Sequence, residues 1–582
     1  MLRVRPNLWF AQFHLWDFYY GLRYCQALLV FHVVCWALKV ECFSGMMFRS
    51  TMDKRFYITT AIDYVNGQPH LGHAYEKIVA DVIARAHRSL GQETFFLTGL
   101  DEHGQKVQQA AIAEGKNPQI YCDALAADWQ AFVKKLELTN DDFVRTTQPR
   151  HKEFVQAILA KLNDAGHFYK ASYEGLYSAK EETFLTEKDR RADGTFDPFY
   201  GEVVKLTEEN YYFKLGAHQQ WLIDHIEKNP TFIQPDYRRN EVLGFLKNSK
   251  LEDLCISRPV SRLNWGIPLP FDSNFVTYVW FDALVNYISI PAAHGDPALR
   301  SGVWGLASGA SGLGSGVQGL GSSVSGLELW PADVHVIGKD ILKFHAVFWP
   351  IMLKAMGLPL PKQILVHGWW QKNGAKISKS TGNVVDPIAV INEWGLDAFR
   401  FYVLRELDIG PDGNWTDAGF RARYSAELAN GLGNLVNRSL SMLKRYRNGI
   451  VPAKSDELAA DAARAADETR ALLRQNQLQA TLQSIWSLVT RANQYVDQTA
   501  PFKLAKDPAQ AKRLDEVLYN LTETCRVLAV LIQPFLPGTA AKIYAQLGLK
   551  ETPDKLSEAV WGKLTPGHQT ADPAPLFPRK DS

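Results

Sequence analysis

The chain alternates short apolar runs with longer segments in which apolar residues recur at helical spacing. Residues 56–61 are rich in β-branched and aromatic side chains, which is typical of a strand. After a turn, residues 70–86 carry apolar positions three and four residues apart, which indicates an amphipathic helix. Residues 94–100 form a second apolar run. Strand, helix and strand in this order predict a parallel sheet.

The same order returns much later in the chain. Residues 335–338 and 364–368 are predicted to be buried strands, with a helix at 341–356 between them. Residues 277–281 are predicted to form one more strand. We therefore expect one nucleotide-binding domain whose parallel sheet is assembled from two separated parts of the sequence.

Two other regions have patterns of their own. Between the two halves, short alternating runs at 173–179, 201–207 and 210–214 predict small β-hairpins. From 411 to 570, apolar residues recur every three or four positions, which predicts a helix bundle. The predicted fold class is therefore α/β: a Rossmann-like parallel-sheet domain, split by an α+β insertion and followed by an all-α bundle.

Composition narrows the partners only slightly. The chain has 582 residues, of which 46% are apolar and 22% charged, and a net charge of +2. This charge gives no overall positive field, so a nucleic-acid partner would need local basic patches. The six cysteines form no C-x-x-C pair, which favours a cytoplasmic location over a disulfide framework.

Polar clusters follow the first two predicted strands directly. His70 and His73 open the first helix, and Asp101 follows the second strand. Open parallel sheets bind ligands at this end of their strands. Two imidazoles one turn apart, beside the free N–H groups of a helix start, suit a phosphate, and Gly72 lets a flat group approach the backbone. The alternative is a pair of surface histidines at a helix start.

A second basic cluster lies about 300 residues further on. Lys376-Ile377-Ser378-Lys379-Ser380 follows Asn373-Gly374, and lysines on such a loop suit a polyphosphate, although a solvated basic loop is the alternative. Together, the Pro-His-Leu-Gly-His and Lys-Ile-Ser-Lys-Ser segments resemble the two signature motifs of class I aminoacyl-tRNA synthetases. Those enzymes activate an amino acid with ATP.

Further segments narrow this resemblance to the methionyl-tRNA synthetases, from about Met52 to about Lys550. They are Ala61-Ile62-Asp63-Tyr64, Tyr278-Val279-Trp280-Phe281-Asp282-Ala283, Gly338-Lys339-Asp340-Ile341, Phe344-His345 and Phe348-Trp349. The resemblance implies a methionine–tRNA ligase, which forms methionyl-adenylate from L-methionine and ATP and then charges tRNA(Met). The alternatives are a class I enzyme for leucine, isoleucine, valine or cysteine, and a non-catalytic tRNA-binding protein.

The resemblance also implies roles for single residues. The implied catalytic residues are His70, His73, Lys376 and Lys379, with Lys379 as the first choice for stabilising the transition state. The implied ATP-binding residues are His70, Gly72, His73, Glu76, Gly338, Asp340, His367, Gly368, Trp370 and Lys379. The implied methionine-binding residues are Ala61, Ile62, Tyr64, Asp101, Trp280, Ala283, Tyr287 and His345.

The chemistry of the methionine residues fits their implied roles. Asp101 would hold the ammonium group, and aromatic rings suit a thioether. His345 or the Tyr287 hydroxyl would hydrogen-bond the sulfur weakly. Phe344 and Trp349 are further candidates for the pocket wall, and the bland alternative is an aromatic core.

The bundle corresponds to the family's anticodon-binding domain. Asn430, Asn434 and Arg438 recur every four residues and so share one helix face, which would contact anticodon bases. Phe502 stands where the family commonly has a tryptophan on which a base stacks. A capped, solvated helix face is the alternative.

The remaining expectations concern metals, assembly and the ends of the chain. Many relatives carry a four-cysteine zinc knuckle in the insertion. This chain has no cysteines in the corresponding stretch, where Asp197-Pro198-Phe199-Tyr200-Gly201 stands, so no structural zinc is expected. Mg²⁺ enters with ATP. A monomer is expected, because no appended C-terminal domain follows the bundle. No membrane partner is expected, because the apolar run at 27–38 is too short to span a bilayer.

The expected domain layout follows from these assignments. Residues 1–51 do not match the rest of the chain and are interpreted as the result of a start codon assigned too early, with a targeting or membrane segment and a packed extension as alternatives. Residues 300–328 are a Gly/Ser-rich flexible insertion. The other expected parts are 52–165 and 259–365 (the catalytic halves), 166–258 (the connective insertion), 366–410 (the lysine loop and junction), 411–570 (the anticodon-binding bundle) and 571–582 (the tail).

Overall fold

The structure is a computed structural model that describes residues 54–65, 67–178, 183–185, 189–191, 193–304, 328–377, 383–551 and 553–580. The N-terminal extension at 1–51 and the loop residue Lys379 lie outside the described residues. So does most of the Gly/Ser-rich segment at 300–328, although its first residues belong to helix α10 (Pro297–Trp304).

The centre of the fold is a seven-stranded sheet in which every pairing is parallel. The strand order is β2-β3-β1-β13-β14-β8, and β4 pairs with β3. The strands are β1 (Arg55–Thr60), β2 (Asp63–Tyr64), β3 (Glu93–Asp101), β4 (Asp142–Arg145), β8 (Ile233–Gln234), β13 (Val334–Gly338) and β14 (Gln363–His367). The predicted parallel sheet is thereby confirmed.

Strand β1 joins the two halves of this sheet. Thr59 of β1 lies opposite Leu97 of β3 on one side and opposite His335 of β13 on the other. Helix α2 (Leu71–Ser89) follows β2 and buries its apolar face, including Ile78 and Val82. The carboxyl ends of strands from both halves of the sequence therefore meet at one edge of one sheet.

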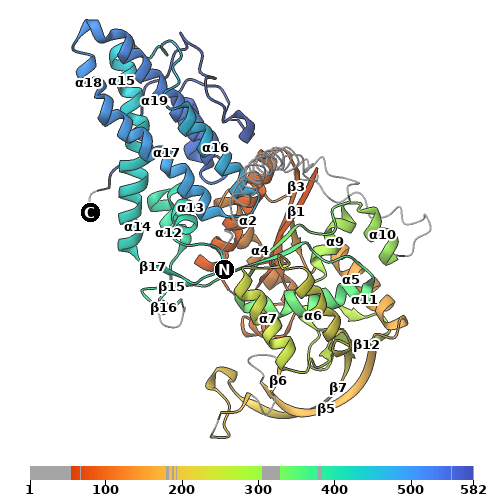
Figure 1. Cartoon of the computed structure of the whole chain (residues 1–582). Helices are drawn as coiled ribbons and strands as arrows, with labels where there is room; N and C mark the ends of the chain where they lie inside the picture. The colour runs from red at the N-terminus through yellow and green to blue at the C-terminus, as the bar shows by residue number, and fades with distance from the viewer. Residues whose placement is uncertain are drawn as a thin grey trace, which may run out of the picture. The chain divides into compact units, whose positions relative to one another are not determined.

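Helices and a bent helical segment complete this region (Figure 1). After β3 come α3 (Gln105–Ala113), α4 (Pro118–Lys135) and α5 (Pro149–Asp164), and α9 (Asn286–Ala293) precedes α10. The helix predicted at 341–356 is a 3₁₀ turn, a π-helix at Phe344–Phe348 and then α11 (Trp349–Met356).

The runs predicted to form small hairpins instead lie in one long antiparallel strand pair. Strands β5 (Phe168–Ser178) and β7 (Val203–Phe213) pair antiparallel along their full length, and Figure 1 shows them as a long curved ribbon. The runs at 201–207 and 210–214, which were expected to be separate, belong to the single strand β7. Within it the buried Asn210 side chain donates to Glu208 and accepts from Ser257. The remaining elements here are β6 (Thr183–Leu185), β9 (Leu254–Cys255), α6 (Gln219–Lys228) and α7 (Asp236–Asn248).

The strand predicted at 277–281 is also wrong. A three-stranded antiparallel sheet of β10 (Ser257–Pro259), β11 (Pro268–Leu269) and β12 (Asp272–Thr277) ends there, and helix α8 (Val279–Ala283) begins two residues later. The apolar run favours a strand locally, but the buried Asp282 carboxylate binds two histidines from neighbouring elements. These tertiary contacts override the local preference.

The predicted helix bundle is confirmed. A small sheet of β15 (Trp370–Lys372), β16 (Ala375–Lys376) and β17 (Gly413–Trp415) leads into it, together with α12 (Pro387–Trp394) and α13 (Leu396–Arg405). The bundle itself is α14 (Asp417–Arg423), a π-helix at Tyr424–Gly433, α15 (Asn434–Arg447), α16 (Ala459–Leu473), α17 (Leu478–Thr499), α18 (Pro501–Leu504), α19 (Ala511–Ile532) and α20 (Pro537–Gln546). No helix of the described residues is long and apolar enough to cross a membrane.

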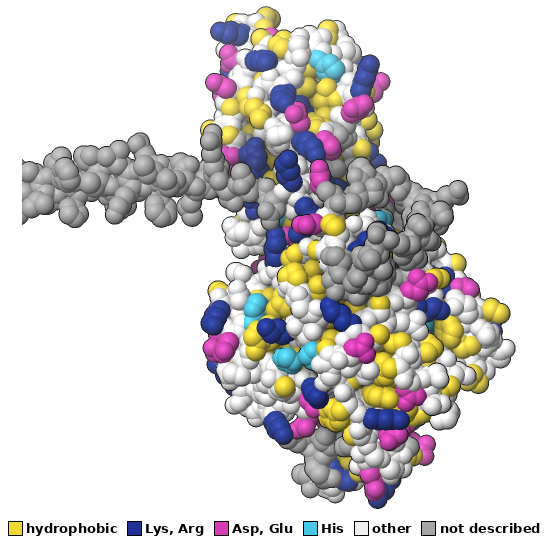
Figure 2. Space-filling view, turned by 90° about the vertical axis from the view of Figure 1, so that its right-hand side faces the viewer, with side chains coloured by type: hydrophobic (Ala, Val, Ile, Leu, Met, Phe, Trp, Pro, Cys, Tyr) yellow, Lys and Arg dark blue, Asp and Glu magenta, His cyan; other side chains and the backbone are white. Residues whose placement is uncertain are grey.

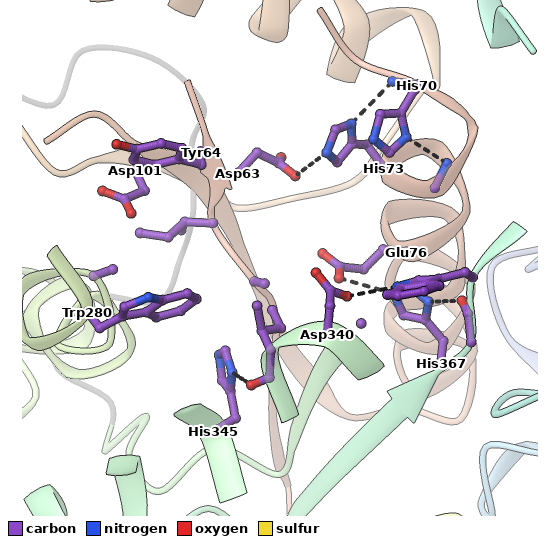
Figure 3. Close-up of a pocket in the computed structure, with 18 of the residues that line it drawn as sticks. Asp63, Tyr64, His70, His73, Glu76, Asp101, Trp280, Asp340, His345 and His367 are labelled. Carbon is purple, nitrogen blue, oxygen red and sulfur yellow. Dashed lines mark hydrogen bonds and ion pairs between the residues drawn. The ribbon is translucent and has the colours of Figure 1, made fainter. Parts of the chain in front are cut away.

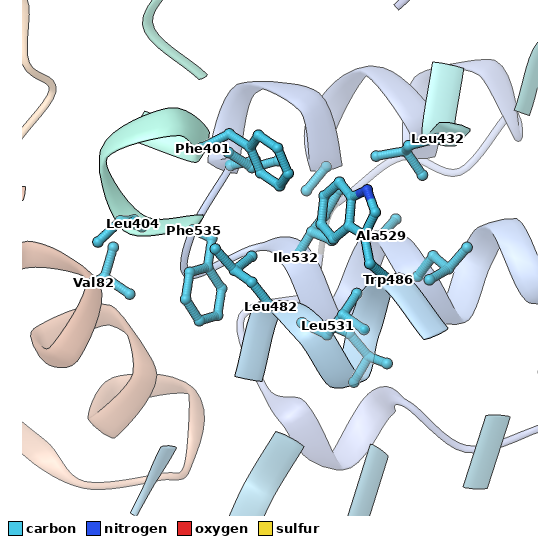
Figure 4. Packing of buried hydrophobic residues seen from close by; sticks show 14 of the residues in the cluster. Val82, Phe401, Leu404, Leu432, Leu482, Trp486, Ala529, Leu531, Ile532 and Phe535 are labelled. Atoms are coloured by element: carbon cyan, nitrogen blue, oxygen red, sulfur yellow. The ribbon is translucent and has the colours of Figure 1, made fainter. Parts of the chain in front are cut away.

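The bundle shares a hydrophobic core with the sheet's covering helix. Val82 of α2, Phe401 of α13, Trp486 of α17 and Ile532 of α19 belong to one buried cluster (Figure 4). The Phe401 and Trp486 rings lie 4.5 Å apart. The helix that begins at His70 is therefore packed against the bundle.

A buried ion pair crosses the same junction. Arg400 of α13 donates to the Asp81 carboxylate of α2 at 2.8 Å and to the backbone carbonyl of Phe535 at 2.8 Å, and both charged side chains are fully buried. Burial favours the neutral form of Asp81, but Arg400 and Arg85 outweigh it and lower the pKa of this carboxyl.

Arg400→Met is expected to lower the free energy of unfolding by about 3–5 kcal/mol, because the buried Asp81 carboxylate loses one of its two arginine partners. Denaturant unfolding followed by fluorescence measures this. Arg464→Met is the control, since the Arg464 side chain, which pairs with Asp461, is 61% exposed, and its effect should stay below about 1 kcal/mol. An equal effect of the two substitutions would contradict the account.

Candidate active site

A cavity of about 650 Å³ opens at the carboxyl edge of the parallel sheet (Figure 3). Its walls come from the ends of β1, β2, β3, β13 and β14 and from the starts of α2 and α8. The lining includes all eight residues predicted for methionine: Ala61, Ile62, Tyr64, Asp101, Trp280, Ala283, Tyr287 and His345. It also includes every described residue predicted for ATP: His70, Gly72, His73, Glu76, Gly338, Asp340, His367, Gly368 and Trp370.

The two histidines of the first motif form a capping box at the start of α2. His70 Nδ1 accepts from the Gly72 backbone N–H at 3.1 Å, and His73 Nδ1 accepts from the His70 backbone N–H at 3.2 Å. Because both Nδ1 atoms are acceptors, each neutral ring carries its proton on Nε2. The rings stack 3.7 Å apart. The helix start thus presents two imidazole N–H donors, which suit an anion.

A side chain at Gly72 would crowd the His70 ring. A Cβ atom at this position would lie 3.0 Å from the His70 ring, tighter than most real contacts. The flat group that approaches this glycine in the structure is therefore the His70 imidazole. This explains the glycine independently of any ligand.

The β14 end of the cavity is built from His367 and its neighbours. His367 Nε2 lies 3.1 Å from a Glu76 carboxylate oxygen. Burial alone would lower the pKa of His367, but the Glu76 carboxylate outweighs burial and raises it. A Cβ atom on Gly368 would clash with the Pro411 carbonyl oxygen at 2.1 Å, so only glycine lets these two segments meet.

Trp369 and Asp412 also line this end, and neither was predicted from the sequence. The Trp369 indole N–H donates to Asp340 at 3.2 Å, and its ring is 41% exposed. Lys339 forms an ion pair with Asp412 at 2.7 Å and lies over the Trp369 ring. Asp412 comes from the loop before β17, so no local pattern connects it to this site.

The opposite end of the cavity is aromatic and carries one buried carboxylate. Asp101 ends β3, next to Tyr64 in strand register. Trp280 stacks on Phe344 with ring centroids 3.7 Å apart. A carboxylate beside aromatic rings can hold a cationic head group and an apolar, polarisable tail.

Tyr287 and His345 form a closed hydrogen-bond chain behind these rings. His345 Nδ1 lies 3.0 Å from the Ile341 carbonyl oxygen and therefore carries the proton, so Nε2 accepts from the Tyr287 hydroxyl at 2.7 Å. Burial lowers the pKa of His345 to about 4, which keeps the ring neutral at pH 7. Both polar hydrogens already have acceptors, so a hydrogen bond to a substrate sulfur would require one of them to change partner.

Phe344 and Trp349 are not among the lining residues of the cavity. Phe344 lies behind Trp280, and the buried Trp349 packs against Tyr287 and donates its indole N–H to His335 at 3.3 Å. Of the two alternatives for these residues, pocket wall and aromatic core, their positions agree with the core. The π-helix at Phe344–Phe348 alters helical phase, so helical spacing alone does not give the direction of these rings.

A buried network holds the two segments that carry Asp101 and Trp280. The Asp282 carboxylate lies 2.6 Å from His103 Nδ1 and 2.7 Å from His151 Nε2. Burial would raise the pKa of Asp282, but the two histidines outweigh it and lower the pKa. The network ties the end of β3 to α8 and so fixes the aromatic end of the cavity.

The lysine motif is described only in part. Lys376 ends β16, and Ile377 lines the cavity, so the chain enters the loop at the mouth of the site. Residues 378–382, including Lys379, lie outside the described residues.

The predicted anticodon residues lie in the bundle. Asn430 is in the π-helix and accepts from Arg579 at 3.1 Å, while Asn434 and Arg438 belong to α15. Arg438 pairs with Asp497 near the end of α17, five residues before Phe502, whose ring is 47% exposed. On the face shown in Figure 2, Lys and Arg are interspersed with Asp and Glu.

In the connective insertion, an ion pair and a cation–π contact link the described residues near 190–197. Arg191 pairs with Asp197 at 2.6 Å, and Arg190 lies over the Phe196 ring. Among the described residues, no group of three or more His, Cys, Asp or Glu side chains could hold a metal ion.

Two family models match the chain. The model for tRNA synthetases class I (M) matches residues 56–195, 200–307 and 322–440. The model for the anticodon binding domain of methionyl tRNA ligase matches residues 448–581.

Individual relatives agree with these matches. The methionine–tRNA ligase of Bacillus subtilis is 40% identical over 549 residues, which cover 90% of this chain and 78% of the relative. That of Rhizobium meliloti is 42% identical over 541 residues, covering 90% and 98%. A structure of Mycobacterium tuberculosis methionyl-tRNA synthetase in complex with methionyl-adenylate aligns with a TM-score of 0.79 at 36% identity, covering 90% of this chain and all of the other.

The depressed pKa of His345 predicts an acid-dependent loss of stability. Between about pH 6.5 and pH 4 the unfolded chain binds a proton here that the folded chain does not, so this contribution to stability falls as the pH is lowered from 6.5 towards 4. His345→Gln removes it. Between pH 7.5 and pH 4.5, the difference in the free energy of unfolding between the variant and the wild type should change by about 2 to 3 kcal/mol in favour of the variant. A difference independent of pH would contradict this.

Proposed function

The chain belongs to the methionyl-tRNA synthetase family, and on that premise we propose how its residues carry out the family's reaction. It is an ATP-dependent methionine–tRNA ligase, which activates L-methionine and transfers it to tRNA(Met). The observation that carries the proposal is one cavity with a pair of imidazole N–H donors at one side and Asp101 among aromatic rings at another.

The first step joins methionine to the nucleotide. A methionine carboxylate oxygen attacks the α-phosphorus of Mg–ATP, the bond from that phosphorus to the bridging oxygen breaks, and pyrophosphate leaves. In the second step the terminal ribose hydroxyl of the tRNA attacks the carbonyl carbon, and AMP leaves. Neither step needs a covalent enzyme intermediate, so catalysis consists of positioning and of stabilising charge on the phosphates.

We assign the methionine end to Asp101, Trp280 and Tyr287. Asp101 binds the ammonium group, and the thioether lies between Trp280 and Tyr287, with Ala61, Ile62, Tyr64, Ala283 and His345 completing the wall. The support is that all of these residues line the same cavity and that its aromatic wall lies beside a buried carboxylate.

We assign the ATP end to the histidine pair and to the ends of β13 and β14. His70 and His73 donate to the phosphates, Gly338 and Asp340 meet the ribose, and His367, Gly368 and Trp370 contact the adenine. Glu76 holds His367. Lys376 and Lys379 approach the phosphates from the other side, since Lys376 and Ile377 lie where the chain enters the loop.

We further propose that the bundle binds the anticodon through Asn434, Arg438 and Phe502, with Asn430 beside them. The exposed Phe502 ring offers a base a stacking surface. The enzyme is proposed to act as a monomer in the cytoplasm without structural zinc. The free cysteines Cys122, Cys255 and Cys525 favour a reducing compartment.

Pyrophosphate exchange into ATP, measured with each of the twenty amino acids, tests the proposed function. Methionine alone should support exchange. Exchange with leucine, isoleucine, valine or cysteine would mean that the aromatic end has been assigned to the wrong substrate. Folded protein that binds tRNA(Met) but exchanges with no amino acid would contradict the proposed catalysis.

Lys379→Ala is expected to slow single-turnover adenylate formation by about 100-fold or more, because it removes a cation from the charge that develops on the phosphates. Methionine affinity should stay within about threefold. Lys247→Ala is the matched control, since Lys247 pairs with Glu227 on the insertion surface. A normal rate in the Lys379 variant would exclude this role.

Phe502→Ala should lower kcat/KM for tRNA(Met) charging by about tenfold or more, because one base loses its stacking partner. Pyrophosphate exchange, which needs no tRNA, should be unchanged. Val560→Ala serves as the control, since Val560 is a comparably exposed apolar residue in the C-terminal part. Equal charging by the wild type and the Phe502 variant would refute the anticodon assignment.

A further inference from the structure

A buried acid–base pair adjoins the histidine pair: Asp63 lines the cavity, and its partner Lys77 is fully buried. Lys77 forms an ion pair with one carboxylate oxygen of Asp63. The other oxygen lies 3.9 Å from His73 Nε2 (Figure 3). His70, His73 and Lys77 are three and four residues apart and so share one face of α2. Asp63 faces them from strand β2.

From this arrangement we infer that Asp63, held and neutralised by Lys77, is a positioning residue that sets the orientation of the His73 imidazole toward the ATP phosphates. The inference rests on the proposed function and adds a residue pair to its ATP end. Neither residue is assigned a role in binding or catalysis by the motifs described above.

The contacts of His73 place the Asp63 carboxylate beside its donor nitrogen. His73 Nδ1 accepts from the backbone, the His70 ring stacks on one side, and the Trp129 ring lies 4.9 Å away at its edge. The Asp63 carboxylate faces the remaining ring nitrogen, Nε2. At 3.9 Å it attracts the N–H by charge without a short hydrogen bond that a phosphate would have to replace.

The buried pair is costly, which favours a role beyond stability. The Lys77 side chain is fully buried and the Asp63 side chain is 5% exposed. Replacing such a pair by apolar residues is often neutral or stabilising, so stability alone gives no reason for it. Burial raises the pKa of Asp63 to about 7, while Lys77 opposes that shift. Without Lys77, a carboxylate here would take up a proton or repel the phosphates.

The pair also connects the two ends of the cavity. Asp63 lies opposite Leu100 in strand register, and the next residue, Tyr64, lies opposite Asp101. The two-residue strand that carries Tyr64 toward the methionine end is thereby tied to the helix that carries the histidines. Because Asp63 lies next to His73 Nε2, a change in the pair is expected to affect the ATP chemistry through His73.

The test removes both charges together, in Asp63→Leu/Lys77→Met, so that no lone charge stays buried. The rate of adenylate formation at saturating substrates should fall about five- to twentyfold, while the KM for methionine changes less than threefold. In a His73→Ala background, removing the pair should cost less than a further twofold, because the pair acts through His73.

A second ion pair, far from the cavity, provides the matched control. Arg447→Met/Asp515→Leu removes a partly buried pair in the bundle and should leave adenylate formation unchanged. If the double variant does not fold, Lys77→Arg takes its place, because it keeps the ion pair. This variant should retain at least half of the wild-type rate of adenylate formation, and a larger loss would count against the inference. An unchanged rate without the pair, or an equal loss with and without His73, would overturn it. Absence of exchange in the wild type would instead overturn the proposed function.

Discussion

The pairing of β1 with β3 on one side and β13 on the other is the constraint on which the site depends. Parallel strands end at the same edge of a sheet, so this pairing brings together chain segments that are far apart in the sequence. His70 follows the β1–β2 segment, Asp101 ends β3, and Gly338 and His367 end β13 and β14. Each side chain needs only a short segment to reach the common cavity. The bundle then fixes α2 from behind, through the shared core and the buried Asp81–Arg400 pair.

Electrostatics give this edge its chemical character. Several carboxylates lie in or just behind the cavity, and most are matched by a nearby base: Asp63 by Lys77, Glu76 by His367, Asp412 by Lys339 and Asp282 by two histidines. Such matching lets acidic groups shape a site that must also accept the phosphates of ATP. We assign Asp101, at the aromatic end, to the ammonium of the substrate. The proposed division into a phosphate end and a methionine end agrees with where these partners lie.

Much of the fold follows from local periodicity. The apolar runs at 56–61 and 94–100 became β1 and β3, and the helical stripes became α2 and the bundle. The errors arose where tertiary contacts decide. The residues predicted to end in a strand form helix α8, where Asp282 binds two buried histidines. Asn210 lies within β7, where its side chain donates to Glu208. In the site, the motif residues could be predicted because they are local in sequence. Asp63, Trp369 and Asp412 could not, because their importance lies in contacts with distant segments.

The central claim is that methionine and ATP meet in this cavity in one orientation. A crystal structure of the protein with methionyl-adenylate tests it most directly. We expect the ammonium within hydrogen-bond distance of Asp101 and the thioether between Trp280 and Tyr287. The phosphate should lie beside His70 and His73, and the adenine against the segment from His367 to Trp370. An adenylate bound in the reverse direction, or outside this cavity, would contradict it.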